Sequence, residues 1–276
     1  MHDDTRVTRA GLLPASEGEP FLSGPTFAPP YHAAGDPSRV PPTYGRFHNP
    51  TWSQFEQALS ELEGGSALVF VSGMAAVTAV FGTVLRPNDI VVLPSDSHYT
   101  TRVIAQGYFT EMGVQVRMAP TGGNALGERL DGAKLLWLKS PSNPGLDVCD
   151  ISGLTTQAHT AGILVSVRDT EWAKRLHPWR TQHGSIAGPM EVWLAYWSLA
   201  TLGVRLDRQC HNAQAIAEYL VARTEVLSVR YPGLATDSTQ PIAKRQMKLF
   251  GAVVSLILPD QDHRERLLQY GYVPFC

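Results

Sequence analysis

Short, almost entirely apolar runs alternate along the chain with segments in which apolar residues recur every three or four positions. The apolar runs predict buried strands at residues 66–73, 89–95, 114–120, 135–140 and 163–167. The periodic segments predict helices at residues 51–63, 74–85, 99–113 and 150–162, the first with Thr51 as its N-cap. Strands that are apolar on both faces and alternate with helices are typical of a mainly parallel sheet covered on both sides. The pattern therefore predicts an α/β fold.

The alternation stops after Val167, because the strand predicted at residues 163–167 is followed directly by charged residues of helical character. Residues 187–224 predict one long helix or a bent pair, residues 251–259 a further strand, and residues 262–269 the start of another helix. At the other end, nine prolines among residues 1–50 exclude long regular structure and indicate an extended arm. We expect an arm over 1–50, a large domain over 51–224, and the start of a shortened C-terminal domain over 225–276.

Composition narrows the function classes. The 276 residues carry a formal charge of −2 and no cluster of Lys or Arg, so a nucleic-acid or anionic-membrane surface is not expected. No apolar run is long enough to span a bilayer. The three cysteines, Cys149, Cys210 and Cys276, lack metal-ligand spacing, and their odd number suits a reducing compartment. A cytoplasmic location with no metal site is the expectation.

Two segments have the chemistry of phosphate sites. At Ser72, Gly73 and Met74 a predicted strand gives way to a helix, where backbone N–H groups and the helix dipole attract anions; such a turn also occurs for packing alone. In the arm, Tyr44 and Arg46 offer a hydroxyl and a planar guanidinium, although a simple surface turn would use the same residues.

Two further residues follow predicted strands. Tyr99 could stack on a flat ring or simply pack. Asn143, in the stretch Ser-Pro-Ser-Asn-Pro, could bind a ligand hydroxyl or form a turn.

The order of the motifs YGRFHNPT, LEGG, SGMAA, SHYTT and SPSNP resembles that of the transsulfuration family, the pyridoxal-phosphate enzymes of cysteine and methionine metabolism such as cystathionine lyases and synthases. The resemblance covers roughly residues 5–258.

The resemblance implies the large domain of a fold-type I pyridoxal-phosphate-dependent transferase, of the aspartate aminotransferase type. It implies that Ser72, Gly73 and Met74 surround the cofactor phosphate, that Tyr99 stacks on the pyridine ring, and that Asn143 lies near the ring hydroxyl. Tyr44 and Arg46 would reach the phosphate of a neighbouring subunit, so a homo-oligomer, a dimer of dimers in the family, is expected. The substrate would be a sulfur amino acid, and the reaction elimination or replacement.

The family's chemistry needs two further groups, an Asp that keeps the ring nitrogen protonated and a Lys that forms a Schiff base. Neither motif is present. Asp169 lies one residue beyond the expected place, and a one-residue shift sends a side chain to the opposite face of the sheet. Lys139 and Lys174 are weak substitutes among the five lysines. We therefore expect an internal deletion after Val167, a truncated C-terminal domain, and cofactor bound non-covalently at best.

Three functions stay open at this point. The chain is an inactive or impaired relative of cystathionine gamma-lyase, or a working lyase with a substitute lysine, or a non-catalytic module that pairs with a complete paralogue through the arm.

Overall fold

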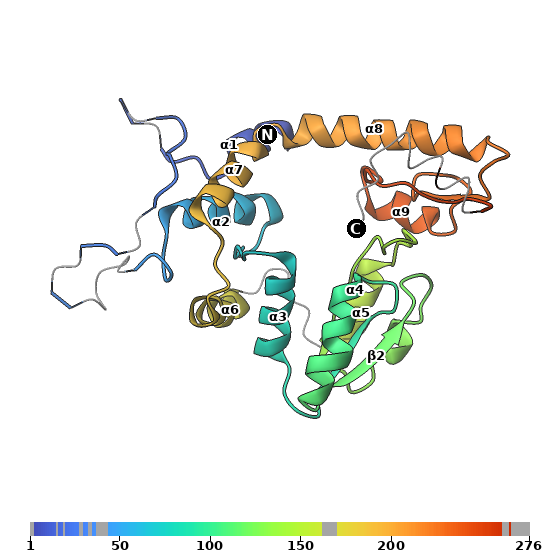
Figure 1. Ribbon diagram of the computed structural model, residues 1–276, viewed down its shortest axis with the longest axis horizontal. Coiled ribbons are helices and arrows are strands. Elements are labelled where there is room, and N and C mark those ends of the chain that lie inside the picture. The colour runs from blue at the N-terminus through green and yellow to red at the C-terminus, as the bar shows by residue number, and fades with distance from the viewer. Residues whose placement is uncertain are drawn as a thin grey trace. The chain divides into compact units, whose positions relative to one another are not determined.

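The computed structural model describes residues 3–14, 16–18, 20–27, 30–32, 35–36, 44–161, 170–260 and 265 (Figure 1). The chain forms two compact units. The first contains Met1–Ile90, Gly107–Gln115 and Leu164–Val204, and the second contains Val91–Gln106, Val116–Ile163 and Arg205–Cys276. The predicted division at residues 50 and 224 stays a prediction.

The first unit is helical. Its helices are α1 (Asp3–Arg9), α2 (Pro50–Glu63), α3 (Gly73–Val84), α6 (Thr170–His183) and α7 (Pro189–Leu199). One core cluster joins the N-terminal segment to α2 and α7 through Ala10, Ala58, Tyr196 and Leu199. The Tyr196 hydroxyl donates to the Ala10 carbonyl at 3.0 Å, which ties the segment after α1 to α7.

Helix α2 starts earlier than the sequence predicted. Its N-cap is Asn49, whose side chain accepts a hydrogen bond from the Thr51 N–H, and Pro50 is the first helical residue. The prediction of Thr51 as N-cap was wrong, because proline at the first helical position has a suitable φ angle and needs no N–H partner. The Thr51 hydroxyl instead accepts from the Thr26 N–H at 2.9 Å, which holds part of the arm against the helix.

The predicted strand over residues 66–73 does not form. Residues 66–70 have no strand assignment, and Gly73 already belongs to α3. Here Val69 is bonded to side chains: its N–H donates to Glu56 Oε1 at 2.9 Å, and its carbonyl accepts from Arg180 Nη1 at 2.9 Å. The prediction failed because a strand requires a neighbouring strand as well as an apolar sequence.

Helices α3 and α6 pack side by side in the first unit, and a glycine permits the approach (Figure 1). A Cβ added to Gly82 of α3 would lie 2.1 Å from the end of the Trp179 ring on α6. The Trp179 ring also stacks on His183, with ring centroids 3.8 Å apart. Gly82 therefore provides the flat surface on which this tryptophan rests.

The second unit contains the predicted parallel sheet. Strands β1 (Ile90–Pro94), β2 (Gln115–Ala119) and β3 (Leu135–Leu136) are arranged in the order β2-β1-β3. Strands β1 and β3 are parallel, with Val91 opposite Leu135 and Val92 opposite Leu136. Helix α4 (Tyr99–Ile104), which continues as a π-helix (Ala105–Phe109), and α5 (Ile151–Thr160) lie between and after the strands. The α/β class is confirmed.

Residues 187–224 form two helices rather than one: α7 belongs to the first unit, and α8 (Leu202–Val221) belongs to the second unit from Arg205 onward. The second unit continues with β4 (Ser228–Arg230), α9 (Gln240–Gln246) and β5 (Ser255–Ile257). Strands β4 and β5 pair antiparallel. The predicted strand at 251–259 is thus shorter than expected. The predicted strand at 163–167 and most of the predicted helix at 262–269 lie outside the described residues.

Cys149 and Cys210 are buried free thiols, and burial raises the pKa of the Cys149 thiol. Cys276 lies outside the described residues. None of the helices in the described ranges is long and apolar enough to cross a membrane. The cytoplasmic location stays a prediction.

We predict that Gly82→Ala destabilises the protein by about 1–3 kcal/mol, because the new methyl group displaces the Trp179 ring. Helix propensity alone would favour alanine by about 1 kcal/mol, so the sign of the change tests the packing. Urea unfolding of both proteins measures it. Gly107→Ala, where an added Cβ meets nothing within 4 Å, is the matched control and should be neutral or stabilising. Equal stability of the two variants would contradict the α3–α6 packing.

Candidate functional site

The start of α3 has an open turn in the first unit. Ser72 is extended (φ −157°, ψ 163°), and its Oγ accepts from the Ala75 N–H at 3.1 Å. Gly73, the first helical residue, is exposed, and an added Cβ would meet nothing within 4 Å. Met74 follows and is half-buried. An open helix start of this kind can admit an anion to the backbone N–H groups, and the phosphate site itself stays a prediction.

The arm residues also belong to the first unit. Arg46 Nη1 donates to the Thr181 carbonyl at 2.7 Å, and its guanidinium carbon lies 4.9 Å from the centroid of the Phe47 ring. Tyr44 is exposed. Together with Trp52 and residues 186–189, Tyr44 and Arg46 line a cavity of about 410 Å³. One donor of Arg46 is therefore committed to α6 of its own chain.

In the second unit, the loops that follow the three parallel strands meet at one edge of the sheet. Asp96, after β1, accepts at Oδ1 from the N–H and the hydroxyl of Thr121, after β2, at 3.0 and 2.8 Å. The Asp96 carbonyl accepts from the N–H of Asn143, after β3, at 3.2 Å. Tyr99 begins α4 and is 70% exposed, so its ring is available to a ligand. This carboxyl edge is where ligands bind in open α/β sheets.

The loop that carries Asn143 is braced from a distant part of the same unit. The Asp147 N–H donates to Ser142 Oγ at 3.1 Å, and the Asp147 carboxylate accepts from Arg230 Nη2 at 2.7 Å. Arg230 also donates to Asp237 at 3.1 Å. The hydrogen bond to Asp147 is the main cause of a raised pKa for Arg230. Sequence reasoning missed this brace because no local pattern relates residues 147 and 230.

The lysines occupy few positions suited to covalent chemistry. Lys139 follows β3 in the second unit and is half-buried. Lys174 is exposed on α6 of the first unit and forms an ion pair with Glu171 at 2.6 Å. The three remaining lysines, all exposed, are Lys134, Lys244 and Lys248. Of the five, Lys139 alone combines partial burial with a place near the carboxyl edge of the sheet.

Asp169 and the junction after Val167 lie outside the described residues. Within the described ranges, no three His, Cys, Asp or Glu side chains lie close enough to hold a metal ion. The candidate residues therefore form two groups, each within one unit. Ser72, Gly73 and Met74 with the arm belong to the first, and Tyr99, Lys139 and Asn143 to the second.

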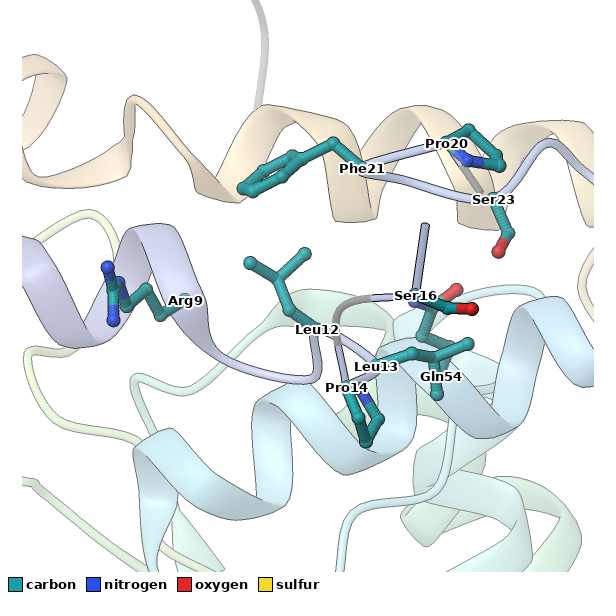
Figure 2. A pocket seen from close by; sticks show the side chains of 9 residues that line it. All are labelled: Arg9, Leu12, Leu13, Pro14, Ser16, Pro20, Phe21, Ser23 and Gln54. Atoms are coloured by element: carbon teal, nitrogen blue, oxygen red, sulfur yellow. The ribbon is translucent and has the colours of Figure 1, made fainter. Parts of the chain in front are cut away.

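A larger cavity, of about 810 Å³, lies in the first unit between the N-terminal segment and α2 (Figure 2). Leucine, proline and phenylalanine side chains form much of its wall, and Arg9 is the charged residue among those that line it. None of the candidate residues lines this cavity. The remaining lining residues, Ser16, Ser23 and Gln54, are polar.

The Arg180 region of the same unit is a cluster of titratable groups. Arg180 on α6 is buried and paired with Glu56 on α2. His177, one turn before Arg180, has a lowered pKa, mainly because burial disfavours its charged form and secondly because of the Arg180 charge. His48 lowers this pKa further, whereas Glu56 raises it.

Comparison with known proteins gives consistent matches. The model of the family "Cys/Met metabolism PLP-dependent enzyme" matches residues 26–170 and 161–270. A Streptomyces coelicolor protein provisionally named cystathionine gamma-lyase is 41% identical over 312 residues, which cover 96% of this chain and 79% of that protein. Cystathionine beta-lyase of Coxiella burnetii is 29% identical over 326 residues, covering 97% and 81%. The crystal structure of a gamma-lyase from Micromonospora echinospora has a TM-score of 0.90 at 27% identity, covering 100% and 84%.

We predict that the protein loses stability as the pH falls below about 6.5, because unfolded His177 then binds a proton that the folded state resists. The folded-state pKa is lowered, so the contribution of this group is complete above the unfolded pKa and decreases below it. The melting temperature should decrease by roughly 2–4 °C more in the wild type than in His177→Gln between pH 7 and pH 5.5. Parallel melting curves for the two proteins over this range would contradict the prediction.

Proposed function

Since the chain belongs to the family of pyridoxal-phosphate-dependent enzymes of cysteine and methionine metabolism, we propose that it performs the family's reaction poorly or not at all. The proposal rests on one observation, that none of the five lysines has the surroundings of a cofactor-binding lysine. Such a lysine must be desolvated and aimed at a single carbon atom. Four of the five are exposed.

The lengths of the alignments support an internal deletion. The alignment with the Streptomyces relative has 312 positions, whereas 96% of 276 residues is about 265, so about 47 positions have no counterpart in this chain. The family model also matches in two parts that meet at residues 161–170, the region of the junction after Val167. A gap of this size has room for a strand together with the missing Asp and Lys.

The remaining residues suit the phosphate end of the cofactor better than its reactive end. Gly73 is exposed at the start of α3, where a backbone N–H group is a donor suited to a phosphate, and Met74 follows it. Tyr99 and Asn143 offer an aromatic face and an amide to a ring and its hydroxyl, by family resemblance. When bound, pyridoxal phosphate supplies an electron sink to its enzyme, provided that its ring nitrogen stays protonated. This chain would bind the cofactor non-covalently.

The substrate class follows from the relatives. Their names are those of lyases that act on cystathionine, so the ancestral substrate of this chain is a sulfur amino acid and the ancestral reaction an elimination or a replacement. The family arm suggests a homo-oligomer. Because Arg46 donates a hydrogen bond to the Thr181 carbonyl of its own chain, it is less able to reach another subunit.

One observation favours a second candidate, a lyase that uses Lys139. This lysine is half-buried, follows β3, and belongs to the same unit as Tyr99 and Asn143. A pairing module for a complete paralogue, the third possibility, would copurify with that paralogue from the native organism.

We predict that the purified protein, mixed with pyridoxal phosphate and treated with borohydride, yields no lysine adduct at a defined residue. We also expect no 2-oxo acid above background from cystathionine, because the covalent anchor is missing. Absorbance spectra and peptide mass spectrometry measure the adduct, and a coupled assay measures the product. Lys139→Ala and Lys174→Ala are matched variants, one half-buried and one exposed. An adduct at residue 139 that accompanies product release, with both lost in Lys139→Ala alone, would establish the second candidate.

A further inference from the structure

We infer that Glu56 and Arg180 are positioning residues for the phosphate-binding turn at Ser72 and Gly73. They hold both polar groups of the Val69 backbone, three residues before the turn, and so fix where the turn lies. The inference rests on the proposed function in one respect, that the ligand of the turn is the cofactor phosphate.

The first support is the geometry at Val69. Glu56 Oε1 accepts from its N–H at 2.9 Å, and Arg180 Nη1 donates to its carbonyl at 2.9 Å. The same two atoms, Oε1 and Nη1, form an ion pair with each other. The pair and the backbone therefore make one closed network, with Glu56 from α2 and Arg180 from α6.

The second support is burial. The Arg180 side chain is 3% exposed and that of Glu56 15% exposed, and the Arg180 guanidinium lies 5.3 Å from the centroid of the Trp52 ring. Hydrogen bonds to charged groups away from water are shorter and stronger than those between neutral groups. Removing one member of a buried pair leaves the other charge uncompensated. The network thus holds Val69 more firmly than a surface contact could.

The third support is that the segment before the turn is bound to α2 at two places. The Ala67 N–H donates to Ser60 Oγ at 2.9 Å, and Val69 is bound by Glu56 on the same helix. Arg180 adds an attachment from α6. Residues in an extended segment are about 3.3 Å apart, so Val69 lies within roughly 10 Å of Ser72 along the chain. A shift at Val69 is therefore passed to the N–H groups of the turn.

The network also gives a role to a residue that no motif identified. Arg180 lies beyond the junction after Val167, on the helix that follows it. In a sheet, the N–H and carbonyl of Val69 would bond to neighbouring strands. Here the side chains of Glu56 and Arg180 make these two hydrogen bonds instead, so the position of the turn does not require neighbouring strands.

The test compares Glu56→Gln with Glu56→Met. Glutamine keeps an oxygen that can accept from the Val69 N–H, whereas methionine has similar volume and no such oxygen. Amide hydrogen exchange is followed at residues 69–74 and, as an internal reference, at residues 77–84 within α3. We expect exchange at 69–74 to be at least tenfold faster in Glu56→Met than in Glu56→Gln, with the interior of α3 changed less than twofold.

A second pair addresses the other side chain. Arg180→Lys can still donate to the Val69 carbonyl and pair with Glu56, whereas Arg180→Met cannot. We expect equilibrium dialysis to give pyridoxal-phosphate binding about fivefold weaker in Arg180→Met than in the wild type, with most of the loss restored in Arg180→Lys. A purely structural role predicts instead that binding follows the melting temperature in all four variants.

Three results would overturn the inference: equal exchange at 69–74 in the two Glu56 variants, equal acceleration at 69–74 and 77–84, or loss of the folded state in Glu56→Met. The last two would show that the pair holds the whole unit and not the turn. If the wild type binds no pyridoxal phosphate, the non-covalent cofactor binding under the proposed function fails, and the exchange comparison still decides the role of Glu56.

Discussion

The backbone polar groups of Val69 impose the constraint on which the position of the turn at Gly73 depends. A buried N–H or carbonyl must be bonded, and at Val69 both bonds are made by charged side chains. Those side chains come from α2 and α6, so the bonds also fix how these two helices flank the segment. The Trp52 ring on α2 packs beside this network, with its centroid 5.3 Å from the Arg180 guanidinium. The position of the turn at Gly73 follows from these contacts, although none of them touches it.

The local sequence pattern predicted the bounds of helices and strands well where short-range interactions determine them. Strands β1 and β2 and helices α3 and α5 lie within two residues of their expected bounds, because their apolar periods and boundary glycines are properties of short segments. The 66–73 strand was wrong because pairing depends on a second segment elsewhere in the chain. The N-cap at Asn49 was missed for a narrower reason, since Pro50 was assigned to the arm rather than to the first turn of α2.

The candidate site shows the same difference between features set by local sequence and features set by contacts between distant residues. Gly73 and Tyr99 were predicted as site residues from motifs, and both are exposed at helix starts, whereas their roles stay predictions. The groups that hold the neighbouring loops could not be identified, because each is a side chain paired with a residue far away in sequence. Arg230 braces the Asn143 loop through Asp147, 83 residues earlier, and Arg180 reaches Glu56 across 124 residues. The sequence around a single arginine does not indicate which distant carboxylate will pair with it in the fold.

A similar fold does not settle the reaction, because the fold supplies a framework and a few groups supply the chemistry. A TM-score of 0.90 to a gamma-lyase reflects a similar arrangement of helices and strands. The reaction depends instead on a single ammonium group and its surroundings. An exposed lysine is strongly hydrated, and the Lys174 ammonium also forms an ion pair with Glu171 on its own helix. Partial burial distinguishes Lys139, but a half-buried ammonium still keeps part of its hydration. The open turn at Gly73 is thus compatible with the proposed cofactor binding, whereas the proposed loss of catalysis depends on the surroundings of the lysines, four of which are exposed.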